Sequence, residues 1–201
     1  MEVVPIFPVP VYISDEYPTT TAETSVLKIQ DWIVNPDGNK FSANNYVLEL
    51  PALGGLKSFL QQQIDTFAYQ VLRIKPETSF YITQSWVNVK VRGTSHHLHS
   101  HPNSLLSGVF FVDGEMAPLA FQRPQTHEIF GNTRLEITEI NPFNATDCSF
   151  PNQKNRAILF PSTSKHFVRE TTVDTPRFSI AFNSFARGLL GDPHGLTGLR
   201  L

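Results

Sequence analysis

The residues of this 201-residue chain that could do chemistry lie mostly in one short stretch. Four of its seven histidines fall within positions 96–101, between two apolar runs that are typical of strands. In an extended chain alternate side chains share a face, so His97, His99 and His101 are expected on one face. His96 and Leu98 are expected on the other. Neutral imidazoles bind metal ions, and His-x-His on a strand presents two of them to one ion, so the stretch predicts a metal site. The alternative is a solvated, polar end of a strand.

A segment near the C-terminal end adds a cation that is expected to be buried. In residues 177–185, Arg177, Ser179 and Asn183 share one strand face, and the aromatic residues share the other. The aromatic face is expected to pack against helices, which directs Arg177 and Ser179 into the interior. An unpaired guanidinium is costly there, so Arg177 needs an anion, either an acidic side chain of the protein or a ligand.

Two helices are expected before the first long strand. The first begins after Thr20, whose side chain forms a capping box with Glu23, and it ends before Asn35 and Pro36. The second begins at Pro51, and its apolar stripe runs to Val71, with polar residues on the opposite face. One face of this second helix should therefore pack on the rest of the protein. The apolar positions of the first helix are Val26, Ile29 and Ile33.

From residue 79 onward the pattern favours strands. In residues 80–92, Trp86, Asn88 and Lys90 share one face and alternate valines form the other. Further strands are expected at 8–13, 105–112, 118–121, 134–140, 156–160, 166–171 and 177–185, with a loop at 142–155. Two helices followed by about eight short strands predict a mainly β fold. We expect a β-sandwich or jelly roll with both N-terminal helices packed on one sheet.

Composition limits the function. The length fits one domain, 1–201. Sixteen basic and eighteen acidic residues form no basic stripe, so electrostatic binding to nucleic acid is not expected. No run approaches the roughly 18 apolar residues of a membrane span. The single cysteine, Cys148, and the absence of an export signal at the start indicate a cytoplasmic protein. The tail, 186–201, is expected to be disordered or to dock on a neighbouring subunit, as in a homodimer.

Several short motifs follow one another in a distinctive order. They are Trp86-Val87-Asn88, His99-x-His101-Pro102-x-Ser104, Ser107-Gly108-Val109, Phe160-Pro161-Ser162 before His166, and Arg177-x-Ser179 before Asn183. This order resembles the Fe(II)/2-oxoglutarate-dependent oxygenases. Within them it resembles a small group common in tailed phages, cyanophages included, and in marine bacteria, for which the setting would be the host cytoplasm. The resemblance covers roughly residues 7–185 and leaves out the tail.

The resemblance implies a double-stranded β-helix with a metal at its open end. It implies that His99, His101 and His166 hold Fe(II), and that Arg177 with Ser179 binds the C5 carboxylate of the cosubstrate 2-oxoglutarate. The planar fork of arginine suits a carboxylate. The implied reaction is the oxidative decarboxylation of 2-oxoglutarate coupled to hydroxylation of a C–H bond. The substrate, a small molecule or a peptide, cannot be read from the sequence.

One position departs from the family pattern. His101 stands where the family usually has a carboxylate, so three histidines replace the usual two histidines and one acid. His97 could substitute for one ligand. Asn88 and Trp86 are weaker candidates for cosubstrate contacts or for pocket lining, and Asn183 is a further pocket candidate. Two other functions stay open: a jelly-roll binding or structural module with a vestigial metal site, and a zinc site of three histidines and water.

Overall fold

The computed structural model describes residues 2–114, 117–125, 131, 133 and 135–201. The described helices are α1 (Thr21–Lys28) and α2 (Gly54–Asp65), and α2 continues into a π-helical segment, Thr66–Val71. Two 3-10 turns, η1 (Val47–Glu49) and η2 (Pro51–Leu53), precede α2. The strands are β1 (Tyr12–Ile13), β2 (Trp32–Val34), β3 (Lys40–Ser42), β4 (Thr78–Lys90), β5 (His96–His99), β6 (Leu106–Phe111), β7 (Leu119–Gln122), β8 (Asp147–Phe150), β9 (Ala157–Pro161), β10 (His166–Val168), β11 (Arg177–Leu190) and β12 (Leu199–Arg200).

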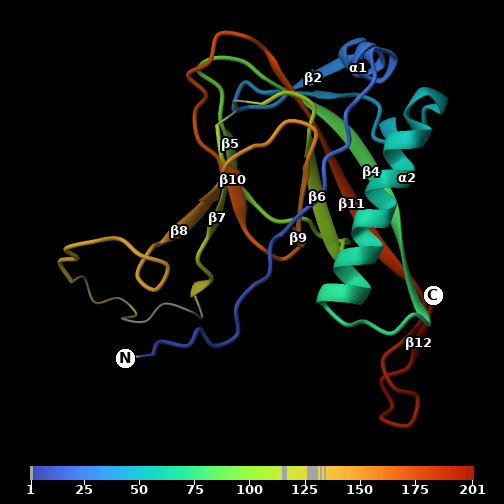
Figure 1. The fold of residues 1–201 in the computed structure, drawn as a ribbon, viewed down its shortest axis with the longest axis vertical. Helices are drawn as coiled ribbons and strands as arrows, with labels where there is room; N and C mark the ends of the chain where they lie inside the picture. The colour runs from blue at the N-terminus through green and yellow to red at the C-terminus, as the bar shows by residue number, and fades with distance from the viewer. Residues whose placement is uncertain (1, 115–116, 126–130, 132, 134) are drawn as a thin grey trace.

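The strands form two antiparallel sheets (Figure 1). The larger has the order β1-β9-β6-β11-β4-β3-β2, with β12 paired to the end of β11, and the smaller has the order β5-β10-β7-β8. Neighbours in each sheet come from distant parts of the chain, as in a jelly roll, so the double-stranded β-helix expected from the sequence is confirmed.

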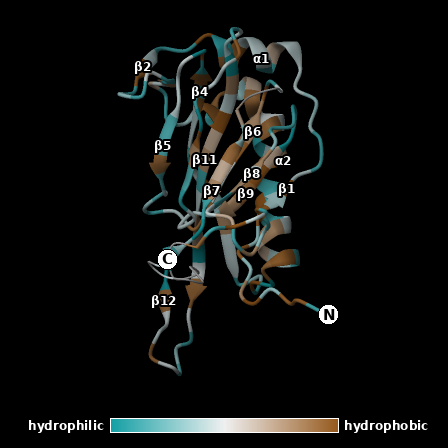
Figure 2. Cartoon of the chain, turned by 90° about the vertical axis from the view of Figure 1, so that its left-hand side faces the viewer, coloured by the Kyte–Doolittle hydropathy of each residue, from teal (hydrophilic) through white to brown (hydrophobic). Residues whose placement is uncertain are grey.

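The helices cover only the larger sheet. In Figure 1, α2 lies beside β4 and β11 on the side away from β5, β10, β7 and β8. Leu56, Leu60 and Ile64 of α2 are fully buried in one core cluster with Val87 of β4 and Phe182 of β11. Figure 2 shows hydrophobic segments where α2 meets β6 and β11. Because α2 covers one face of β4 and β11, the opposite faces of these two strands turn toward the smaller sheet.

The first helix is shorter than expected. The capping box of Thr20 and Glu23 is present, but α1 ends at Lys28. Residues 32–34 instead form β2, which pairs with β3, and β3 extends the large sheet beside β4. Ile29 is 80% exposed and Ile33 46% exposed, so their helical spacing did not reflect burial. Pairing in the tertiary structure overrides the local pattern here.

Three further segments differ from expectation. No strand is present in 135–140, and Arg134 lies outside the described residues. The expected loop 142–155 contains β8, which pairs with β7. The tail is a hairpin, because β11 runs to Leu190 and pairs with β12. None of the described helices is long and apolar enough to cross a membrane.

Candidate metal and cosubstrate site

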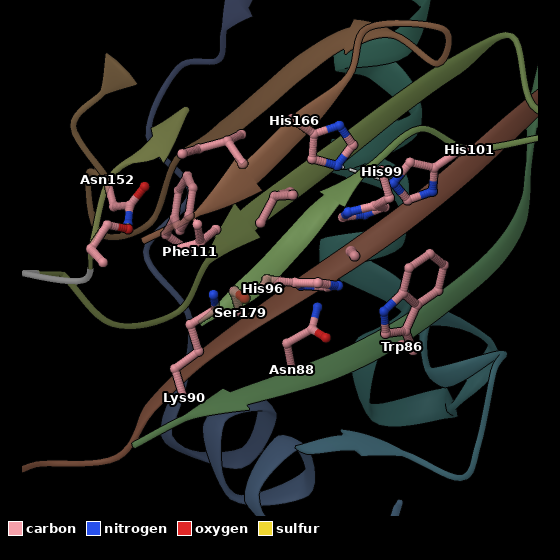
Figure 3. A pocket seen from close by; sticks show the side chains of 15 residues that line it. Trp86, Asn88, Lys90, His96, His99, His101, Phe111, Asn152, His166 and Ser179 are labelled. Atoms are coloured by element: carbon pink, nitrogen blue, oxygen red, sulfur yellow. Dashed lines mark hydrogen bonds between the residues drawn. The ribbon is translucent and has the colours of Figure 1, made fainter. Parts of the chain in front are cut away.

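Three histidines from neighbouring strands converge at the inner face of the smaller sheet. His99 ends β5 and lies opposite His166, the first residue of β10. His101 follows β5, and its backbone N–H donates to the carbonyl of Ser162 at 3.0 Å, which fixes the chain beyond the strand end. One ring nitrogen of each histidine lies within 4.8 Å of the other two. Figure 3 shows the three rings gathered at one end of a cavity.

Backbone carbonyls select the nitrogen that two of the three rings offer. Nδ1 of His99 is 2.8 Å from the carbonyl oxygen of His97, and Nδ1 of His166 is 2.9 Å from that of Ser164. A carbonyl only accepts, so each Nδ1 carries the proton and each Nε2 keeps a lone pair for a metal. Nε2 of His101 and Nε2 of His166 are 3.2 Å apart. Two ligands about 2.1 Å from one ion, at right angles, would be about 3 Å apart, so the pair fits a shared metal.

A polar network supports His101 from behind. The ring stacks on Trp86 with centroids 5.9 Å apart, and it forms a hydrogen bond with the side chain of Asn183. Oδ1 of Asn183 accepts from Oγ of Ser107 at 2.9 Å, and Ser107 is 2.7 Å from Oγ of Ser162. The Ser-Gly-Val and Phe-Pro-Ser motifs therefore supply the hydroxyls that orient Asn183. Asn183 belongs to the support of a histidine rather than to the cavity wall.

The convergent histidines are neutral at physiological pH. Burial lowers the pKa of His101 to about 4 and that of His166 to about 3, and the neighbouring histidines act in the same direction. Burial also lowers the pKa of His99. Since metal ions bind the neutral imidazole, the site does not have to lose protons before it can bind one at pH 7.

The first two histidines of the stretch differ in what they line. His96 lines the cavity and stacks on His99 with centroids 4.5 Å apart, whereas His97 faces an outer groove, where Nδ1 lies 2.7 Å from Oδ2 of Asp37. His97 still lies beside His99, with ring centroids 5.3 Å apart, and both line this groove with His101. The difference from expectation is that His96 also lies beside His99 instead of on the opposite face. His166 of β10 pairs with His99 of β5, and Val168 of β10 pairs with His96. Two residues along β10 therefore span the same length as three residues along β5. Such a bulge breaks the alternation of side chains.

His96, His97 and His99 form a second group whose ring nitrogens also lie within 4.8 Å of one another. His99 belongs to both groups, and its Nδ1 already donates to a carbonyl. One available nitrogen cannot serve two ions at once. The group with His101 and His166 is the more enclosed of the two, since His97 is exposed whereas His166 is 3% exposed.

The cavity is small and extends away from the three histidines. Its volume is about 50 Å³, which gives room for roughly four water-sized groups and therefore for a small ligand. The cross-strand pairs Trp86–Ala181 and Asn88–Ser179 of β4 and β11 line it. Asn152 also lines it, and its Nδ2 donates to the carbonyl of Ala117 at 2.7 Å, so the segment 142–155 borders the cavity at this residue.

The basic end of the cavity differs from the sequence-based expectation. Ser179 and Asn88, both predicted, are buried and line the cavity. Arg177 is half-buried at the start of β11, directly opposite Lys90, and the lining includes Lys90 but not Arg177. Sequence reasoning gave Lys90 no role. Its position on the same strand face as Trp86 and Asn88 was the signal that could have identified it.

An open groove adjoins the cavity beside the histidine strand. Its volume is about 330 Å³, within the range of small-molecule sites. Trp86, Asn88 and His99 line both the groove and the cavity, so the two spaces meet beside the histidines. The rest of its wall includes Asn35, Phe41, Asn45 and Gln84.

Comparison with protein families identifies the domain that carries this site. Residues 84–183 match the family described as "Putative 2OG-Fe(II) oxygenase". The match runs from the strand before the histidines to Asn183 and includes every histidine of the convergent group. No curated protein matches the chain in sequence.

Solved structures share the fold at low sequence identity. HygX from Streptomyces hygroscopicus, with nickel, 2-oxoglutarate and hygromycin B bound, has a TM-score of 0.60 and 11% identity over 88% of this chain and 82% of its own. A prolyl-4-hydroxylase from Pseudomonas putida has a TM-score of 0.55 and 10% identity over 90% of this chain and 94% of its own. A 2OG-Fe(II) oxygenase family oxidoreductase from Burkholderia pseudomallei has a TM-score of 0.55 and 11% identity over 80% and 74%. These likenesses establish the jelly-roll fold.

Proposed function

Since this chain is an oxidoreductase of the 2OG-Fe(II) oxygenase family, we propose that it binds Fe(II) through His99, His101 and His166 and uses 2-oxoglutarate as cosubstrate. The observation that carries the proposal is the convergence of three neutral imidazoles at one end of the cavity, with the tautomers of His99 and His166 fixed by backbone carbonyls. The bound iron and cosubstrate would supply the oxidising chemistry that hydroxylates a C–H bond. The protein supplies the geometry and a site shielded from water.

The cavity wall suits the cosubstrate. A 2-oxo acid that binds a metal at the histidine end would lie along Asn88 and Ser179 toward the basic end formed by β4 and β11. The amide of Asn88 and the hydroxyl of Ser179 can donate to carboxylate oxygens. Arg177, eleven residues after the distal histidine, is the cation that the family resemblance assigns to the far carboxylate. We keep Arg177, Ser179 and Asn88 as the proposed cosubstrate residues.

The alternative of a zinc hydrolase has less support. A metal-bound water that attacks a substrate usually needs a nearby general base. Among the described residues, the cavity is lined by no aspartate or glutamate. The alternative of a binding or structural module with a vestigial metal site also has less support. Such a module does not require histidine rings whose tautomers and orientation are fixed by hydrogen bonds.

The assignment to one group within the oxygenase family rests on the sequence motifs. We place the chain in the group common in tailed phages and marine bacteria because the motifs occur together and in that order. A cytoplasmic setting is supported by the free, exposed thiol of Cys148. A homodimer stays a prediction.

Calorimetric titration of Mn(II) into single histidine variants tests the metal site. Replacing His99, His101 or His166 with Ala should weaken binding by more than about 100-fold, the upper end of the loss when only an outer-shell partner is removed. His194→Ala is the matched control, because His194 is exposed in the hairpin between β11 and β12. His127, a second control chosen from the sequence, lies outside the described residues. Unchanged affinity in His166→Ala would remove the distal ligand from the proposal.

A further inference from the structure

Lys90 is a buried cation that the proposed metal site does not explain. It ends β4, is 4% exposed, and its Nζ has no hydrogen-bond partner among the described residues. An ammonium group in this position loses its hydration without compensation. Lys90 also lines the cavity that holds the histidines. Figure 3 shows it at the end away from His166, with Ser179 and Asn88 beside it.

The neighbours of Lys90 favour an anion at this end of the cavity. The register of β4 and β11 places Arg177 directly opposite Lys90, and like charges in directly opposite positions repel each other. The acidic group that acts on Lys90 is Asp37, but its Oδ2 already contacts the ring and the backbone N–H of His97. Burial lowers the pKa of Lys90 to about 7, so the ammonium form is disfavoured until a negative charge approaches.

We propose that Nζ of Lys90 binds a carboxylate of the cavity's ligand at the end away from the histidines. The inference rests on the proposed function, in which the ligand is 2-oxoglutarate and this group is its far carboxylate. It adds a lysine on β4 to the arginine on β11, and it makes Lys90 a residue that determines cosubstrate specificity. A 2-oxo acid with a second carboxylate engages both the metal and Lys90, whereas a 2-oxo monocarboxylic acid of the same length engages only the metal.

The test compares two 2-oxo acids on the Mn(II)-loaded protein, in which no turnover occurs. 2-Oxoglutarate and 2-oxopentanoate have the same chain length, and only the first carries the far carboxylate. Lys90→Met should lower the affinity for 2-oxoglutarate by about tenfold to a hundredfold, as expected when a charged hydrogen-bond partner is lost. The affinities for Mn(II) and for 2-oxopentanoate should not change. Lys40→Met, which alters an exposed lysine on β3, should leave all three affinities as they are.

Thermal unfolding separates a binding role from a structural one. Methionine fills a similar volume without a buried charge, so the ligand-free Lys90→Met protein should melt at the same temperature as the wild type or higher. A lower melting temperature with equal losses for both 2-oxo acids would mean that Lys90 only shapes the cavity, and would overturn the inference.

Two further outcomes distinguish this inference from the proposed function. Wild-type affinity for 2-oxoglutarate in Lys90→Met, with a loss in Arg177→Leu, would assign the carboxylate to Arg177 alone and leave the proposed function standing. No 2-oxoglutarate binding by the Mn(II)-loaded wild type would overturn both.

Discussion

At the scale of single residues, the site depends on which nitrogen each histidine offers. The carbonyls of His97 and Ser164 hold the Nδ1 protons of His99 and His166 and leave each Nε2 for a metal. These contacts come from the backbone, so they form whenever β5 and the turn before β10 fold. Two of the three proposed metal ligands are therefore oriented by the strands before any ion binds.

Buried neutral histidines make the metal-free protein sensitive to acid. The folded-state pKa values of His96 and His166 are about 3 and that of His101 about 4, against about 6.5 for an unperturbed histidine. Between these values the unfolded chain binds more protons than the folded one, so the free energy of unfolding falls as the pH falls below about 6.5. Urea unfolding in the presence of a chelator should show lower stability at pH 5.5 than at pH 7.

Lys90 and Asp37, whose pKa values are also shifted, contribute little in that interval. The pKa of Lys90 is about 7 in the folded state, so its effect lies between about pH 7 and its unfolded value near 10.5. The pKa of Asp37 is lowered from 3.8 by its hydrogen bonds to His97, so its effect lies below the interval. Equal stability at pH 7 and pH 5.5 would show that the histidines are not buried in the neutral form.

Substitution can test the proposed role of Arg177. If it binds the far carboxylate, Arg177→Leu should weaken 2-oxoglutarate by about 2 kcal/mol or more, roughly thirtyfold, and leave Mn(II) affinity nearly intact. Calorimetric titration of each ligand measures both. A loss of stability without a selective loss of 2-oxoglutarate affinity would indicate a structural salt bridge instead.

At the scale of elements, β6 and β11 set the spacing on which the site depends. Gly108 of β6 pairs with Phe182 of β11, and a Cβ added at Gly108 would overlap the ring of Phe182. The glycine of the Ser-Gly-Val motif thus lets a fully buried aromatic ring lie against the neighbouring strand. The adjacent pair, Ser107 and Asn183, supports His101.

Gly108→Ala should therefore destabilise the protein by about 1–3 kcal/mol, the usual cost of overpacking a core. Urea unfolding provides the measurement. Gly54→Ala at the start of α2 is the control, because a Cβ there meets nothing within 4 Å and should cost nothing. Loss of Mn(II) affinity in Gly108→Ala would show that the strain reaches His101. Equal stability of Gly108→Ala and the wild type would refute the close packing.

At the scale of the whole molecule, the sequence was informative where short motifs coincide with regular strands. Alternation placed Trp86 and Asn88 on the cavity face of β4, and the motif order led to His166. Reasoning from the sequence failed where pairing with another strand decides the geometry. The place of His96 in the cavity depends on a bulge against β10, which no local pattern encodes. The burial of Lys90 depends on its face of β4 being turned toward the smaller sheet, which the sequence of β4 alone does not show.

The central claim is that one folded domain binds a metal and 2-oxoglutarate together. The most direct measurement is the melting temperature of the protein with Mn(II), with 2-oxoglutarate, and with both. A ligand that binds only the folded state raises this temperature. Because the 2-oxo acid is expected to bind through the metal, the two together should raise it by about 5 °C or more beyond the sum of their separate effects, when both are near 100 times their dissociation constants. No added stabilisation by 2-oxoglutarate in the presence of Mn(II) would contradict the account.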